Sequence, residues 1–146
     1  MYNLERILIS ACLLGVSCRY DGGSKPAEGA AALMKKYELI PVCGEILGGL
    51  PTPRTPAERV GFRVLTQDGR DVTAEYEHGA REVLRLAELF GCRKAVLKER
   101  SPSCGSGKIY DGSFTGALTD GFGVTAELLA QNGIEVFGES EIEKLL

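Results

Sequence analysis

Cysteines are the residues of this chain that are best suited to chemistry, and three of them share one kind of position. Each comes at or just after a short apolar run that predicts a buried strand: Cys12 in the run 6–13, Cys43 at the end of 37–43, and Cys104 after 94–100. A segment rich in glycine or proline follows each of them. Ligands of an open parallel sheet bind beyond the carboxyl ends of its strands, so we expect these three thiols to meet at one edge. Cys92 lies at the end of a predicted helix and is expected to be structural.

Thiol groups gathered in this way favour a metal centre. No C-x-x-C pair is present, which argues against a zinc ribbon, and soft sulfur ligands favour an iron–sulfur cluster or zinc. Three ligands on a four-iron cluster would leave one iron open for substrate. Cys18 as a fourth ligand would close the site and make it a non-catalytic iron–sulfur or zinc centre. A cysteine nucleophile without metal is a third hypothesis, and the spacing does not decide among the three.

Polar residues beside the cysteines could take part in the same chemistry. Glu45 follows the second strand-end cysteine by two residues and could be a general base for water, or a solvated loop residue. Ser101 and Ser103 could orient a substrate or satisfy a turn. Arg19 and Asp21 are polar groups suited to the rim of a substrate pocket.

The elements that must position these residues alternate between strand and helix. Helices are predicted at 26–37, 73–90 and 123–132, the second capped by Thr73, together with a terminal helix whose capping box is Ser140 with Glu143. A fourth strand is predicted at 134–137 and a hairpin or edge strand at 61–73 around Asp68-Gly69, whereas 44–57 and 105–123 are expected to be functional loops. This order predicts an α/β fold, a single three-layer domain over 1–146 with a mostly parallel, Rossmann- or flavodoxin-like sheet. His78, on the outer side of the longest helix, is expected at the surface.

Composition and charge limit the class of partner. The 146 residues are 44% hydrophobic and 25% charged, with a net charge of −3, which argues against a dedicated nucleic-acid binder and does not favour tRNA as a partner. The apolar run near the start is short and carries Glu5 and Arg6, so it favours a strand over a signal peptide or membrane span. We expect a cytoplasmic protein without a membrane partner, whose cysteines are reduced thiols or metal ligands.

Five segments of the chain, in order, resemble the thiouracil desulfidase family. They are SACLLGVSCRYDG (10–22), PVCGEILGGLPTPRTPAE (41–58), LKERSPSCG (97–105), IYDGSFTG (109–116) and GFGVTAELLAQNGIEVF (121–137). The resemblance covers nearly the whole chain. It implies a [4Fe–4S] cluster and replacement of the thiocarbonyl sulfur of a small thiolated uracil or uridine by oxygen, without net redox change.

The same resemblance assigns roles to individual residues. It places the cluster ligands on Cys12, Cys43 and Cys104, the catalytic carboxylate on Glu45, and an assisting hydroxyl on Ser101. One departure is Gly44, where the family usually has proline. A glycine is expected to make this loop more flexible and to loosen the carboxylate that follows it. Longer members carry a second, C-terminal domain, and the resemblance leads us to expect the single-domain short form here.

Overall fold

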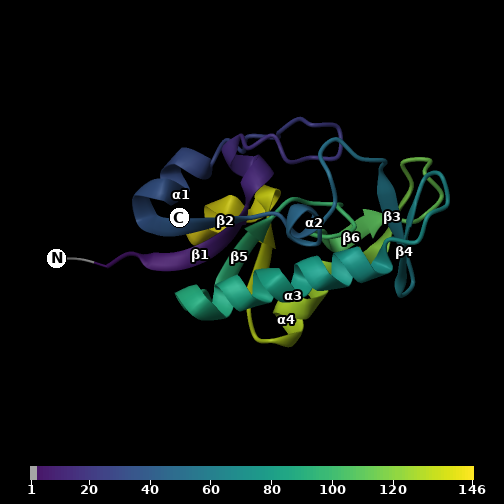
Figure 1. The fold of residues 1–146 in the computed structure, drawn as a ribbon. Helices are drawn as coiled ribbons and strands as arrows, with labels where there is room; N and C mark the ends of the chain where they lie inside the picture. Colours follow the sequence, from purple (N-terminus) through teal and green to yellow (C-terminus); the bar gives the residue numbers. More distant parts are fainter. Residues whose placement is uncertain (1–2) are drawn as a thin grey trace.

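The computed structural model describes residues 3–146, and a four-stranded parallel sheet lies at its centre (Figure 1). The sheet has the strand order β2-β1-β5-β8, with bounds Tyr37–Val42, Glu5–Ser10, Lys94–Leu97 and Glu135–Gly138. All neighbouring strands are parallel; for example, Leu8 of β1 is in register with Ile40 of β2 and with Ala95 of β5. Numbered by their order along the chain, the four strands lie second, first, third, fourth. This is the flavodoxin-like order, so the predicted fold is confirmed.

Side chains of the central strands alternate between two hydrophobic cores. Ile7 and Ile9 of β1 pack on one side with Leu33, while Leu8 packs on the other side with Val83 and its neighbours. Because both faces of a parallel sheet are covered, its strands consist of almost uninterrupted apolar residues. The two cores make the molecule three layers thick, as the sequence predicts.

Helices cover both faces of the sheet (Figure 1). One face carries η1 (Ala11–Leu14), α1 (Ala30–Lys36) and η2 (Glu139–Leu145), and the other carries α3 (Thr73–Phe90) and α4 (Val124–Gln131). The short α2 (Gly44–Leu47) follows β2 and packs against α3. Within residues 3–146, no helix has both the length and the apolar character needed to cross a membrane.

Two antiparallel hairpins stand beside the main sheet. The first joins β3 (Ala57–Val60) to β4 (Arg63–Thr66), and the second joins β6 (Ser106–Tyr110) to β7 (Leu118–Phe122). The first turns at residues 61 and 62, and the predicted Asp68-Gly69 turn follows β4. The second hairpin corrects the prediction of a loop over 105–123. Only one residue of this pair, Ile109, is buried, so the segment has no alternating pattern that would predict strands.

One predicted helix start and two predicted caps are wrong in detail, whereas the predicted bounds 73–90 of α3 are confirmed. Helix α1 begins at Ala30, not at Pro26. The Thr73 hydroxyl accepts a hydrogen bond from the Val64 amide instead of capping α3, and Asp71 accepts the Thr73 amide. The last element is a 3-10 helix in which Glu141 accepts the Gly138 amide. At the two predicted caps, the Thr73 hydroxyl accepts the Val64 amide and the Ser140 hydroxyl donates to Glu99. A local capping pattern does not reveal such remote partners.

Candidate active site

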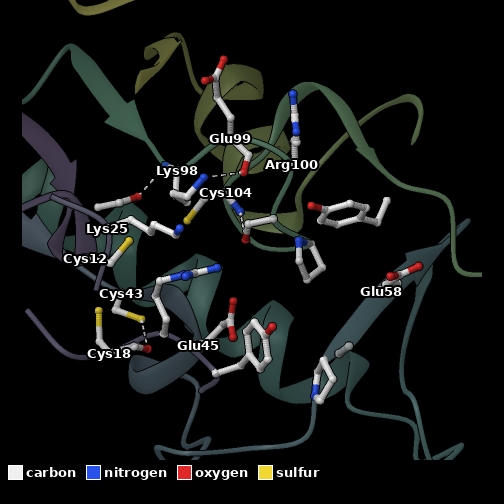
Figure 2. Close-up of a pocket in the computed structure, with 18 of the residues that line it drawn as sticks. Cys12, Cys18, Lys25, Cys43, Glu45, Glu58, Lys98, Glu99, Arg100 and Cys104 are labelled. Atoms are coloured by element: carbon white, nitrogen blue, oxygen red, sulfur yellow. Dashed lines mark hydrogen bonds between the residues drawn. The ribbon is translucent and has the colours of Figure 1, made fainter. Parts of the chain in front are cut away.

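A cavity of about 660 Å³ opens at the carboxyl ends of β1, β2 and β5 (Figure 2). Strand β2 lies on one side of β1, and the next strand of the sheet along the chain, β5, lies on the other side. The direction in which strands are added therefore reverses between β1 and β5. Open α/β sheets bind ligands at such a switch point. The cavity is lined by four cysteines, Cys12, Cys18, Cys43 and Cys104.

Two of these cysteines are held by short turns directly after their strands. Cys12 lies in η1, and its carbonyl accepts the amides of Gly15 and Lys25 at 3.2 and 2.9 Å. Gly15 has a φ of 95°, a left-handed conformation that glycine adopts without strain. Cys43 is the extended residue between β2 and α2. Both thiols therefore sit on backbone that the sheet fixes.

Cys104 is presented by a turn that is joined to α4. The Ser101 hydroxyl oxygen accepts the amides of Ser103 and Cys104, each at 3.0 Å. The carbonyls of Pro102 and Ser103 accept the amides of Val124 and Thr125, both at 2.8 Å. These carbonyls satisfy amides of the first turn of α4, which lack partners within the helix. The sequence SPSCG thus serves to fold a rigid turn that ends a strand on a cysteine.

Burial and the charges of neighbouring cysteines make the thiols of Cys12, Cys18 and Cys104 hard to ionise. Burial, followed by the charges of the neighbouring cysteines, raises the pKa of Cys12 to about 12. Burial is also the main cause that raises the pKa of Cys104 to about 12 and that of Cys18 to about 11. Thiolates gathered here need positive charge, and metal binding supplies it because thiolates are the ligand form of cysteine.

The thiols surround the cavity and do not meet at one point. Within residues 3–146, no group of three or more His, Cys, Asp or Glu side chains is close enough together to hold a metal ion. Figure 2 shows Lys25 and Lys98 on the same side of the cavity as Cys12 and Cys104. The donors are thus a set of soft sulfur atoms around a cavity, which suits a sulfur-ligated cluster.

Glu45 faces the same cavity from α2, where an arginine and a tyrosine surround it. Arg54 donates to Glu45 Oε2 from Nε at 2.7 Å, and its second terminal nitrogen lies 2.7 Å from the same oxygen. Tyr76 of α3 is 3% exposed, and its pKa is raised by burial and then by the charge of Glu45. A carboxylate that is paired with an arginine and faces the same cavity as the thiols can accept a proton from water.

The end of the cavity away from the thiols is formed by the hairpins. The carboxylate of Glu58 on β3 is 9% exposed, and it accepts the amides of Gly112 and Phe114 at 2.9 and 3.1 Å. These bonds hold the loop between β6 and β7, in which Phe114 has the unusual φ of 57°. Tyr110 and Phe114 both line the cavity. Aromatic and polar groups together suit a small, flat, polar ligand.

Comparison with known proteins agrees with this geometry. The family model described as 2-thiouracil desulfurase matches residues 7–141. The chain belongs to the 2-thiouracil desulfurase family. It is 41% identical to a Bacillus subtilis (strain 168) protein named "Uncharacterized protein YbbK", with 96% of this chain and 99% of that protein covered. It is also similar to the solved structure of a protein named "[4Fe-4S]-dependent thiouracil desulfidase TudS", with 50% identity, a TM-score of 0.92, and coverage of 97% and 95% of the two chains.

For this desulfurase family member, the structure brings most of the predicted site residues together. The lining of the cavity includes the three predicted ligands, and also Glu45, Ser101 and Arg19. Cys92 lies in the core under α3, and His78 is exposed, as the sequence predicts for both.

Two residues predicted to bind substrate lie outside the lining of the cavity. Ser103 is 1% exposed, and its hydroxyl is hydrogen-bonded to Thr125 at 2.9 Å. Asp21 is exposed, and its carboxylate accepts a hydrogen bond from the Gly23 amide at 2.9 Å. The same carboxylate lies 4.0 Å from the guanidinium group of Arg19. In a tight turn, residues two positions apart can face opposite sides, so sequence alone could not separate Ser103 from Ser101.

Gly44 has a different role from the one expected. A Cβ atom at this position would lie 2.7 Å from Thr125 Oγ1 and 2.8 Å from Ser103 Oγ, so the hydroxyl pair occupies that space. Gly44 is buried in the first turn of α2, and its carbonyl accepts the Gly48 amide at 2.9 Å. The expectation of a loosened loop is therefore wrong: the glycine permits close packing.

Arg54 and Tyr76, which surround Glu45, are two of the cavity residues that the sequence reasoning missed. Arg54 lies in the segment PTPRTP between α2 and β3, which predicts only a loop. Tyr76 belongs to the predicted apolar face of α3, and nothing in the sequence indicates that it also lines the cavity. A lone arginine within a proline-rich loop next to a candidate base is the one pattern that could have indicated the ion pair.

Proposed function

We propose that this protein removes sulfur from thiouracil by iron–sulfur-dependent desulfuration. The observation that carries the proposal is the meeting of Cys12, Cys43 and Cys104 with Glu45 around one cavity of a desulfurase-family fold. The similar protein TudS bears a name that states the same cofactor class and substrate. A closed four-cysteine site would leave Glu45 without a chemical task.

Each of the three cysteines would bind one iron of a [4Fe–4S] cluster. The cluster supplies an open iron that can bind the sulfur of the substrate. Cys18 is 3% exposed, and its carbonyl oxygen lies 4.0 Å from Cys43 Sγ. We place Cys18 beside the cluster but not among its ligands, so that the fourth iron stays open.

Glu45 would activate the water that replaces sulfur. It accepts a proton from water as the water oxygen bonds to the ring carbon. The carbon–sulfur bond then breaks, the second proton and the one held by Glu45 go to sulfur, and hydrogen sulfide leaves. Thiocarbonyl plus water gives carbonyl plus hydrogen sulfide, so no oxidant or reductant is needed.

Ser101 and Arg19 would hold the substrate. The Ser101 oxygen accepts two backbone amides, which fix its position at the cavity, and its hydroxyl hydrogen would be donated to the substrate. Arg19 offers a cation at the rim. The cavity of about 660 Å³ accommodates a free base or a nucleoside, and the net charge of −3 makes tRNA the less favoured substrate.

Anaerobic purification followed by a desulfuration assay tests the proposal. The protein should be brown, with iron and sulfide in cluster amounts, and should convert 2- or 4-thiouracil to uracil with release of one sulfide per turnover. Glu45→Gln should keep the iron and lose turnover by roughly 10²–10⁴-fold, the usual contribution of a general base. Glu127→Gln is the matched control, because Glu127 also pairs with an arginine, at 2.6 Å, outside this cavity. A parent protein with a full cluster and no release of sulfide from any thiolated base or nucleoside would contradict the proposal.

A further inference from the structure

Arg54 connects the candidate base to a cysteine loop that is remote in sequence. Arg54 lies in the segment between α2 and β3, and its side chain is 7% exposed. One terminal nitrogen contacts both Glu45 Oε2 at 2.7 Å and the Cys18 carbonyl at 2.9 Å. The other donates to the Pro51 carbonyl at 3.2 Å and to Thr52 Oγ1 at 3.1 Å.

The backbone of Arg54 is fixed as well as its side chain. Its amide donates to the Tyr20 carbonyl at 2.7 Å, so the main chain and the guanidinium group both bind the loop that carries Cys18. A planar guanidinium with several partners loses little freedom when it is buried, whereas a lysine would offer only a point charge. The arrangement sets the distance between α2 and the Cys18 loop.

The two oxygens of the Glu45 carboxylate are thereby made different. Both contacts from Arg54 converge on Oε2. A charge buried in this way needs its partner, because an unpaired buried carboxylate would turn toward water or lose its charge. With Oε2 held by Arg54, proton acceptance falls to Oε1.

We infer that Arg54 is a positioning residue for desulfuration, which acts by fixing the Glu45 carboxylate so that Oε1 faces the reacting water. The inference rests on the proposed role of Glu45. Arg54 does not touch the reacting atoms. It holds the carboxylate of Glu45, and its bond to the Cys18 carbonyl holds the loop that forms another wall of the cavity. A misplacement of the base by about 1 Å is enough to lower turnover by about 10²-fold.

A double-mutant cycle separates this role from simple structural support. Arg54→Ala should keep its iron content and KM while turnover falls by about 10²-fold. In the Glu45→Gln background, the same change should lower turnover no further, because residues that act as one unit are not additive. Guanidinium ion at concentrations that do not unfold the protein should restore turnover to Arg54→Ala, but not to the variant that also carries Glu45→Gln.

Arg59→Ala is the matched control. Arg59 also has a largely covered side chain, which is 12% exposed. It makes an ion pair to Glu127 at 2.6 Å and donates to the Phe122 carbonyl at 2.7 Å, and it lies outside the lining of the site cavity. Its removal should change stability without changing turnover per cluster. If Arg54→Ala does not fold, Arg54→Lys replaces it in the double-mutant cycle. Lysine keeps the positive charge but cannot contact the partners of the planar guanidinium group at the same time.

The outcomes distinguish this inference from the proposed function. An iron-loaded parent protein without turnover would refute the function, and full activity of Glu45→Gln would refute the role of the base. Arg54 variants that are fully active, or whose loss of turnover multiplies with that of Glu45→Gln, would overturn the positioning role alone.

Discussion

Gly44→Ala is a sharp test of how α2 is positioned. The new Cβ would meet Thr125 Oγ1 at 2.7 Å and Ser103 Oγ at 2.8 Å, whereas its third neighbour, Thr125 Cβ, lies at an ordinary 3.8 Å. Both hydroxyls must move, which breaks their hydrogen bond. Overpacking of a close-packed site costs about 1–3 kcal/mol, and the lost hydrogen bond adds about 1 kcal/mol. Alanine regains about 0.5–1 kcal/mol over glycine within a helix, so we expect a net loss of about 1–3.5 kcal/mol in the free energy of unfolding.

The same contacts define the control. In a protein that carries Ser103→Ala and Thr125→Ala, both oxygens are gone and the new Cβ has room. Gly44→Ala should then raise the free energy of unfolding by about 0.5–1 kcal/mol, because only the gain of alanine over glycine within a helix remains. The measurement is urea unfolding of the parent, the single variant, the double background and the triple variant under identical anaerobic conditions. Equal destabilisation in the two backgrounds would refute the steric argument, because the clash with the hydroxyls would then not be its cause.

Three further predictions concern other parts of the molecule. Alanine at any one of the three proposed cluster ligands should abolish iron binding, whereas Cys92→Ala should keep full iron in a colorimetric assay; full iron in any one of the three ligand variants would contradict the ligand set. Tyr76 has a pKa raised above its ordinary value of 10.0 by burial and by Glu45, so its contribution to stability is complete below pH 10 and is lost as the pH rises further. An ultraviolet titration from pH 9 to 11 should therefore be the same for Tyr76→Phe and the parent, and a smaller phenolate signal in the variant would contradict the shift. Glu58→Gln should weaken the bonds to the amides of Gly112 and Phe114 and lower stability by about 1–2 kcal/mol; hydrogen exchange of those two amides should accelerate, and unchanged exchange would show that the carboxylate does not hold the loop.

The sequence by itself determined the layout of this protein. Apolar strands alternate with helices, and this periodicity is local, so the parallel sheet could be predicted without any long-range information. Cys12, Cys43 and Cys104 follow three of these strands, and parallel strands bring their carboxyl ends to one edge. The meeting of the thiols therefore follows from their placement along the chain.

Only the tertiary structure decided which polar groups serve the cavity. Ser101 and Ser103 are chemically alike and two residues apart, yet one lines the cavity and the other pairs with Thr125 of α4, because the turn rotates between them. The pairing of Arg54 with Glu45 depends on the path of an irregular proline-rich loop, which has no periodicity to read. Periodic patterns determine which face of a helix or strand is buried, whereas contacts between loops depend on the positions of every element that supports them.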